Sequence, residues 1–150
     1  MKTIKRILLI LILTAVGMVP VSAHMFSGNN WTWLYSDSEV SVYLGRYYYD
    51  VDRDQLSCYL GYRYPAQNSC RVEFTTFDYY YKKYIVTYIE EYDDQGHELD
   101  SYNTNAGWED VEANDGTFMG MLMQKAADNS SRDYQLLYYD PRTHPHKSHK

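Results

Sequence analysis

The sequence lacks the residue groupings that catalysis usually needs. Of its five histidines, four lie at the two ends of the chain that follows residue 23, and only His97 lies within it, directly after a turn glycine. Glu90 and Glu91 are adjacent, so on a strand their carboxylates face opposite sides and cannot act as a pair. An active site normally needs a nucleophile beside a base, or paired carboxylates. The sequence therefore predicts a protein that is not an enzyme and uses no cofactor, with His97 as an exposed loop residue.

Positive charge is also scarce. The chain has 14 Lys and Arg residues against 20 Asp and Glu residues, which gives a net charge of −6. Removal of the first 23 residues would take away Lys2, Lys5 and Arg6 but no acidic residue, so the remaining chain would be still more acidic. Such a chain repels phosphate backbones, and the sequence contains no basic stripe. It therefore predicts no nucleic-acid partner.

Long apolar runs are missing as well, because no stretch of about 20 apolar residues follows residue 23. The sequence thus predicts no transmembrane segment. At the N-terminus, three basic residues precede an apolar run at 7–16, and small residues at 21–23 offer a cleavage site, which is the pattern of a secretory signal peptide. We expect residues 1–23 to be removed and the protein to be secreted, periplasmic or at the cell surface. No cysteine stands at the cleavage point, which argues against a lipid anchor.

Cysteine is limited to Cys58 and Cys70. In an exported chain two cysteines favour a disulfide, and we predict that these two pair. A simple hairpin centred on residues 65–68, however, would set Cys70 opposite Arg63, five residues away from Cys58. A bridge would need a turn centred near Tyr64 or a looser connection, and the sequence leaves these arrangements open.

A run of alternating aspartates, Asp50, Asp52 and Asp54, resembles the opening of a calcium-binding loop. Gln55 stands where such a loop needs glycine, and Gly61 stands where it needs a bidentate glutamate. The run therefore predicts a solvated turn.

Tyrosine, by contrast, is abundant, with 18 residues, and many of them lie in stretches where apolar and polar residues alternate. Period-two alternation and aromatic enrichment are typical of β-strands with half-buried rings. Strands are predicted within residues 31–102, at 31–35, 40–49 with a bulge at Gly45, 56–64, 70–75, 79–92 and 97–102.

The sheet is expected to be organised around the strand at 79–92. In a regular strand, Tyr84, Val86, Tyr88 and Tyr92 lie on one face, and Ile85, Thr87 and Ile89 lie on the other. Both sets are largely apolar or aromatic, which predicts a central strand covered on both sides, one of them incompletely.

The C-terminal part carries one helical pattern. Phe118, Met119, Leu122, Met123 and Ala126 fall at helical spacing and predict a helix over 117–127. Alternation at 134–138 predicts a last short strand, and 141–150 predicts a disordered, histidine-containing tail. Residues 24–140 are thus expected to form a single α+β domain, an antiparallel β-sheet of about six strands with one C-terminal helix packed on one face.

Three motifs resemble those of the bacterial surface adhesin protein E family of small exported proteins. They are Trp31-x-Trp33-Leu34-x-Ser36-Asp37, Tyr92-Asp93-x-Gln95-Gly96-x-Glu98-Leu99, and Trp108 shortly before a C-terminal helix. The resemblance implies a six-stranded antiparallel sheet with one docked helix and an extracytoplasmic binding or adhesive role. Members of the family often place a cysteine near the C-terminal helix, and 117–127 contains none.

Two binding hypotheses follow. Tyr80, Tyr84 and Tyr88 are predicted to form an aromatic face that the helix leaves uncovered and that binds a host or envelope protein or glycan. Alternatively, the protein binds copper or zinc, because cleavage after Ala23 would expose the amine and imidazole of His24. The remaining ligands of the alternative would come from the tail, at His144, His146 and His149.

Overall fold

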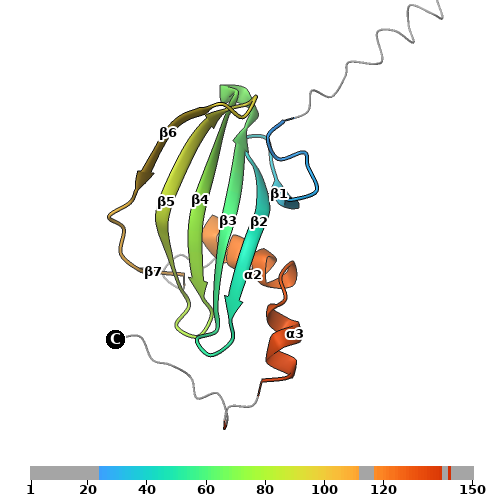
Figure 1. Ribbon diagram of the computed structural model, residues 1–150, viewed down its shortest axis with the longest axis vertical. Coiled ribbons are helices and arrows are strands. Elements are labelled where there is room, and N and C mark those ends of the chain that lie inside the picture. Colours follow the sequence, from blue (N-terminus) through green and yellow to red (C-terminus); the bar gives the residue numbers. More distant parts are fainter. Residues whose placement is uncertain (1–23, 112–116, 140–141, 143–150) are drawn as a thin grey trace, which may run out of the picture.

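The computed structural model describes residues 24–111, 117–139 and 142. Within these residues, a single antiparallel sheet runs in the order β1-β2-β3-β4-β5-β6, and a short seventh strand, β7, pairs with β5 (Figure 1). The strands are β1 (Thr32–Ser36), β2 (Ser41–Asp50), β3 (Gln55–Tyr64), β4 (Ser69–Asp78), β5 (Lys83–Asp93), β6 (Glu98–Asn103) and β7 (Glu109–Asp110). The helices are η1 (Pro65–Gln67), α2 (Phe118–Asp128) and α3 (Arg132–Leu137). The sheet-dominated fold with a C-terminal helix agrees with the predicted α+β class.

Strand boundaries follow the local chemistry of the chain. Pro65 cannot continue the ladder of β3, and it opens η1, which ends at Asn68 in the left-handed conformation. Gly96 adopts a positive φ in the turn between β5 and β6, a conformation that glycine tolerates best. The bulge predicted at Gly45 is confirmed, since the pairing of β2 with β3 shifts between Leu44 and Tyr47.

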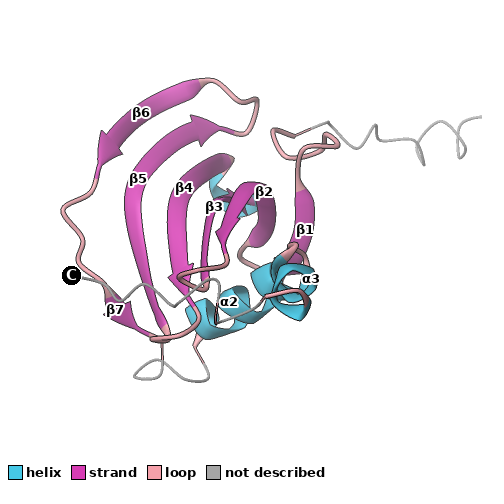
Figure 2. Cartoon of the chain, turned by 60° about the horizontal axis from the view of Figure 1, so that its bottom comes forward, coloured by secondary structure: helices cyan, strands magenta, loops and turns pink. Residues whose placement is uncertain are grey.

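The sheet is strongly curved, and α2 and α3 lie across the side towards which it curves (Figure 2). Residues directly opposite each other in an antiparallel sheet share a face, so the register assigns each side chain to one of two faces. The face that carries Leu56, Cys58 and Leu60 of β3 is called the helix face. The face that carries Tyr59 and Gly61 is called the outer face. Side chains of β1 to β4 on the helix face form one buried cluster with Leu122 of α2. Full burial of each such leucine stabilises the fold by about 1.5–3 kcal/mol.

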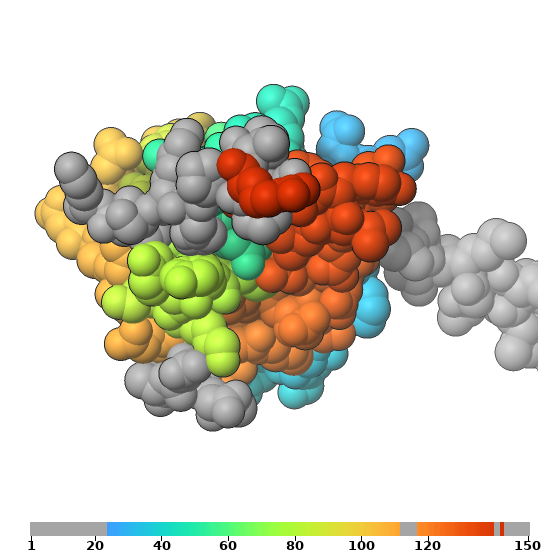
Figure 3. Space-filling model, turned by 90° about the horizontal axis from the view of Figure 1, so that it is seen from below, coloured from blue at the N-terminus to red at the C-terminus, as the bar shows by residue number. Residues whose placement is uncertain are grey.

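The segment that was expected to be a last short strand is instead the helix α3. The alternating aromatic residues Tyr134 and Tyr138 are also four residues apart, and their ring centroids lie 5.1 Å from each other on one side of that helix. Leu136 packs against the main buried cluster. From below, the orange atoms of α2 lie beside the yellow-green atoms at the end of β4 and the turn that follows it (Figure 3).

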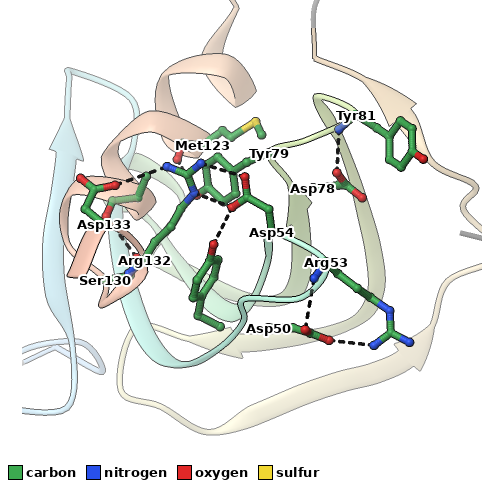
Figure 4. A network of polar contacts seen from close by, with 12 residues as sticks. Asp50, Arg53, Asp54, Asp78, Tyr79, Tyr81, Met123, Ser130, Arg132 and Asp133 are labelled. Carbon is green, nitrogen blue, oxygen red and sulfur yellow. Dashed lines mark hydrogen bonds and ion pairs between the residues drawn. The ribbon is translucent and has the colours of Figure 1, made fainter. Parts of the chain in front are cut away.

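A network centred on Arg132 ties α3 to the turn between β2 and β3 (Figure 4). Arg132 donates from Nε and Nη2 to the two carboxylate oxygens of Asp54, at 2.8 and 2.9 Å. Its guanidinium also lies 4.2 Å from the centre of the Tyr79 ring. Tyr49 donates its hydroxyl to Asp54, and Tyr79 donates to the carbonyl of Met123 in α2. Sheet, turn and both helices thereby share one polar junction.

The aspartate run forms the predicted turn between β2 and β3, at residues 51–54. The carboxylates of Asp50 and Asp54 are engaged within the protein. Asp50 accepts hydrogen bonds from the backbone of Asp52 and Arg53 and from the Arg53 guanidinium, while Asp54 binds Arg132. The prediction of a turn is confirmed, but the turn is not solvated as expected, because the side chains of Asp50 and Asp54 are only 23% and 17% exposed and bind arginines.

The predicted disulfide is wrong, because Cys58 and Cys70 are both free thiols. Cys58 is opposite Thr75 and Cys70 is opposite Arg63, so they lie five residues apart along paired strands, a separation of about 17 Å. They also lie on opposite faces, Cys58 on the helix face and Cys70 on the outer face. A disulfide requires Cα atoms within about 7 Å, so the regular β3–β4 hairpin excludes it.

The upper part of the outer face is covered by the N-terminal strap, residues 24–31. Phe26 is buried there with Cys70 and Val72, and Met25 and Trp31 pack around it. Two glycines make room for the strap. A Cβ on Gly61 would lie 2.5 Å from the Phe26 ring, and one on Gly45 would lie 2.7 Å from the Trp31 ring.

Side chains hold this strap in place. Its own backbone hydrogen bonds close turns within the strap, from Ser27 to the His24 carbonyl and from Trp31 to the Gly28 carbonyl. Trp31 precedes β1 and packs in the outer cluster with Phe26 and Tyr43, and Trp33 is opposite Tyr43, so these two tryptophans lie on the same side of the sheet, as predicted. Tyr35 does not share that side. Pairing with β2 shifts between Trp33 and Tyr35, which places these two side chains on opposite faces.

Replacement of Arg132 by Ala is expected to lower the free energy of unfolding by about 2 kcal/mol, because it leaves the Asp54 carboxylate without its bidentate partner. Arg53→Ala is the matched control. The Arg53–Asp50 pair is more exposed, with 43% of the Arg53 side chain accessible against 20% for Arg132, and we expect a loss below about 0.5 kcal/mol. Urea unfolding measures both, and equal losses would contradict the central role of Arg132.

Gly61→Ala is expected to cost about 1–3 kcal/mol, because the added methyl group overlaps the Phe26 ring. In a Phe26→Ala background the same substitution should cost less than about 0.5 kcal/mol, since the conflict is gone. Gly28→Ala is the control, because a Cβ at Gly28 meets no atom within 4 Å. Denaturant unfolding measures the free energy of unfolding of the two single variants and the double variant. If the losses of the single variants add up to the loss of the double variant, Phe26 does not occupy this position.

Both thiols should be present and poorly reactive in the folded protein. Burial raises the pKa of Cys58 to about 12 and that of Cys70 to about 11. At a pH of about 8 an aromatic disulfide reagent should therefore react slowly with the native protein and rapidly with both cysteines in urea. Protein purified without reductant should be used. If urea exposes no thiol, the cysteines are oxidised and the register of β3 with β4 must differ.

Candidate functional site

The structure does not bring the three tyrosines of the predicted aromatic face together. Tyr80 lies in the turn between β4 and β5, where 61% of the residue is exposed and its ring packs edge-on against Tyr81. Tyr84 lies on the helix face and donates its hydroxyl to Glu109 of β7. Burial, and to a smaller extent that hydrogen bond, raises the pKa of Tyr84 to about 12. Tyr88 lies on the outer face, directly opposite Phe74.

A β-bulge in β5 causes this separation. Phe74 is opposite Tyr88 while its neighbour Thr75 is opposite Val86, so Thr87 is the extra residue and it is exposed. The bulge reverses the alternation, and the assignment of Tyr84 and Tyr88 to one face is therefore wrong. The strand is also the fifth of six, next to the edge strand β6, and is less central than expected.

Tyr88 instead belongs to an outer aromatic row that sequence reasoning missed. Tyr59 of β3, Phe74 of β4 and Tyr88 of β5 are opposite one another in register across three neighbouring strands. The rings of Tyr59 and Phe74 lie 5.1 Å apart, and 36% of Tyr59 is exposed. Nothing in the sequence marks these three residues as a group, because they come from separate strands and the bulge sets their register.

Beside this row lies an outer groove of about 530 Å³, between the N-terminal strap and the sheet. It is larger than the hollow at Trp108, of about 270 Å³, and the hollow at Leu99, of about 210 Å³. The strap, the bulge of β2, and strands β3, β4 and β5 all contribute to the outer groove. Its lining residues are Met25, Asn30, Trp31, Arg46, Tyr59, Val72 and Glu90.

The charged groups of the groove do not neutralise each other directly. Arg46 is exposed and makes no hydrogen bond or ion pair within the described part of the chain. Glu90 is half-buried, and its Oε2 accepts a hydrogen bond from the Tyr92 hydroxyl at 2.7 Å. Burial, followed by this bond, raises the pKa of Tyr92. A donor-only guanidinium and an acceptor carboxylate thus line the same hollow without bonding to each other.

Near the start of the strap, an ion pair joins β3 to the turn after β5. Arg63 binds both carboxylate oxygens of Asp94, at 2.8 and 2.9 Å, and this contact lowers the pKa of Asp94. The charges of Arg63 and Asp94 act on the pKa of His24. The centroid of the His24 ring lies 5.6 Å from that of the Tyr43 ring. Burial, followed by the charge of Arg63, lowers the pKa of His24.

Of the proposed metal ligands, only His24 lies in the described part of the chain, and His144, His146 and His149 lie outside it. Nδ1 of His24 accepts a hydrogen bond from the backbone of Phe26 at 3.2 Å, so this nitrogen is already in use. Chelation by Nδ1 together with the amine would break that bond. Across residues 24–111, 117–139 and 142, no group of three or more His, Cys, Asp and Glu residues is arranged to hold a metal ion.

His97 follows the turn glycine and is exposed, as predicted. Its ring hydrogen-bonds to Asp93 at 2.8 Å. None of the described helices is long and apolar enough to cross a membrane.

Comparison of the chain with protein-family models, curated proteins and solved structures finds no match.

Proposed function

We propose that the chain is an exported, non-catalytic binding or adhesion module whose ligand site is the outer groove together with the outer aromatic row. The leader pattern at residues 1–23 supports export, and the resemblance to the surface adhesin family supports attachment to a host or envelope component. The observation that carries the site is the convergence of Arg46, Glu90 and Tyr59 in one groove, with no bond between the two charged groups.

The position of the groove favours binding without large rearrangement. Tyr59, Val72 and Glu90 lie on strands that pair with a neighbour on each side, and Arg46 lies at the bulge of β2. A rigid support of this kind avoids the entropy cost of ordering a loop when the ligand binds. Exposed aromatic surface next to polar groups is typical of recognition sites.

The lining also explains why we propose binding without catalysis. Among the described residues that line the groove, Glu90 is the only general base, and none of them is a serine, cysteine or histidine. Ser101, which is opposite Glu90 on β6, does not line the groove. The chemistry that the groove offers is hydrogen bonding and aromatic contact.

Retention of the mature domain, residues 24–150, on surfaces coated with envelope or host-matrix fractions tests the proposal. Tyr59→Ala and Arg46→Gln should each reduce retention by about tenfold, the loss typical of a residue central to an interface. Both side chains are partly exposed, so the melting temperature should change by less than about 3 °C.

The matched control is Tyr134→Ala, because Tyr134 is an exposed tyrosine on α3 that does not line the outer groove. Its retention should equal that of the unmodified domain. If the two groove variants are retained as well as the control, the ligand site lies elsewhere and the proposal fails.

A further inference from the structure

The outer groove presents a mixed set of hydrogen-bonding groups. Arg46 only donates, the Glu90 carboxylate only accepts, and the Asn30 amide does both. The formal charges of Arg46 and Glu90 cancel. A complementary ligand therefore accepts and donates hydrogen bonds at neighbouring positions and carries no net charge, which is the property of a set of hydroxyl groups.

The aromatic part of the lining comes from two sides. Trp31 belongs to the strap and Tyr59 to the sheet, so a ligand in the groove meets an aromatic ring from each. The C–H face of a sugar ring packs favourably on such rings because its polarised hydrogens meet the negative face of the π-system. The volume of about 530 Å³ falls in the range of about 300–1,000 Å³ that small-ligand sites occupy.

An extended peptide fits the groove less well. Peptides that bind sheets usually add a strand to a free edge, where unpaired backbone groups give most of the affinity. The groove instead lies on the face of the sheet, and β3 and β4 are each paired on both sides. Recognition there rests on side chains alone, which is how saccharides are bound.

We propose that the outer groove binds an uncharged oligosaccharide. Trp31 and Tyr59 contact the faces of its sugar rings, and Arg46 and Glu90 hydrogen-bond to its hydroxyls. This inference rests on the proposed function, because it names the ligand class of the same site.

The experiment uses the fraction that retains the mature domain, divided into samples treated with protease or with periodate followed by borohydride. Periodate cleaves vicinal diols of sugars, and borohydride then reduces the resulting aldehydes. We expect retention to survive protease and to fall at least about tenfold after periodate. If protease abolishes retention and periodate does not, the ligand is a protein and the saccharide inference is overturned, while the proposed function stands.

A second measurement examines charge. Salt screens interactions between charges, and an uncharged ligand makes few of them. Retention should therefore change less than about twofold between low and high salt. A loss of about tenfold or more would mean a charged ligand and would overturn the inference. If retention is insensitive to Tyr59→Ala and Arg46→Gln in the untreated fraction, the proposed function itself fails. The three results therefore separate failure of the ligand class from failure of the site.

Discussion

The contact between Phe26 and Gly61 is the constraint on which the outer face depends. A side chain at Gly61 would overlap the Phe26 ring, so the strap packs here only because β3 has a glycine at this position. Phe26 in turn lies against Tyr43, with ring centroids 5.2 Å apart, and against Trp31, at 4.7 Å. Since Trp31 lines the outer groove, the groove exists as a hollow because the strap is docked. Removal of that contact would leave an open sheet surface.

The two faces of the sheet are closed in different ways. On the helix face, Leu122 packs against the strands, and Arg132 binds Asp54 in the turn. On the outer face, a short irregular segment is held by aromatic side chains and covers only part of the surface. The uncovered remainder carries the outer aromatic row and Arg46, which has no partner among the described residues. A small domain with one helix-covered face thus keeps its other face for binding, which is the division we propose for this protein.

Much of the fold could be predicted from the sequence, because period-two alternation and turn residues such as Pro65 and Gly96 report directly on strands and their ends. The bulge in β5 could not be predicted. Both alternating sets of residues in this strand are largely apolar, so the sequence does not show where the alternation reverses. That one residue moved Tyr88 away from Tyr84 and placed it opposite Phe74. The candidate site was missed for the same reason, because it combines the strap with residues of four strands whose register the sequence does not specify. For the cysteines the sequence carries the correct signal, because the regular hairpin around residues 65–68 places Cys70 opposite Arg63, and this register outweighs the tendency of exported cysteines to pair.

The most direct test of this account is a nuclear magnetic resonance measurement of the contact between Phe26 and Gly61 in the mature domain. If the strap is docked on β3, strong nuclear Overhauser effects are expected between the Phe26 ring protons and the Gly61 α-protons, and the ring current should shift the α-proton resonances. Docking of the strap would be contradicted if these effects were missing and residues 24–31 showed random-coil chemical shifts, because the strap would then not form a wall of the groove.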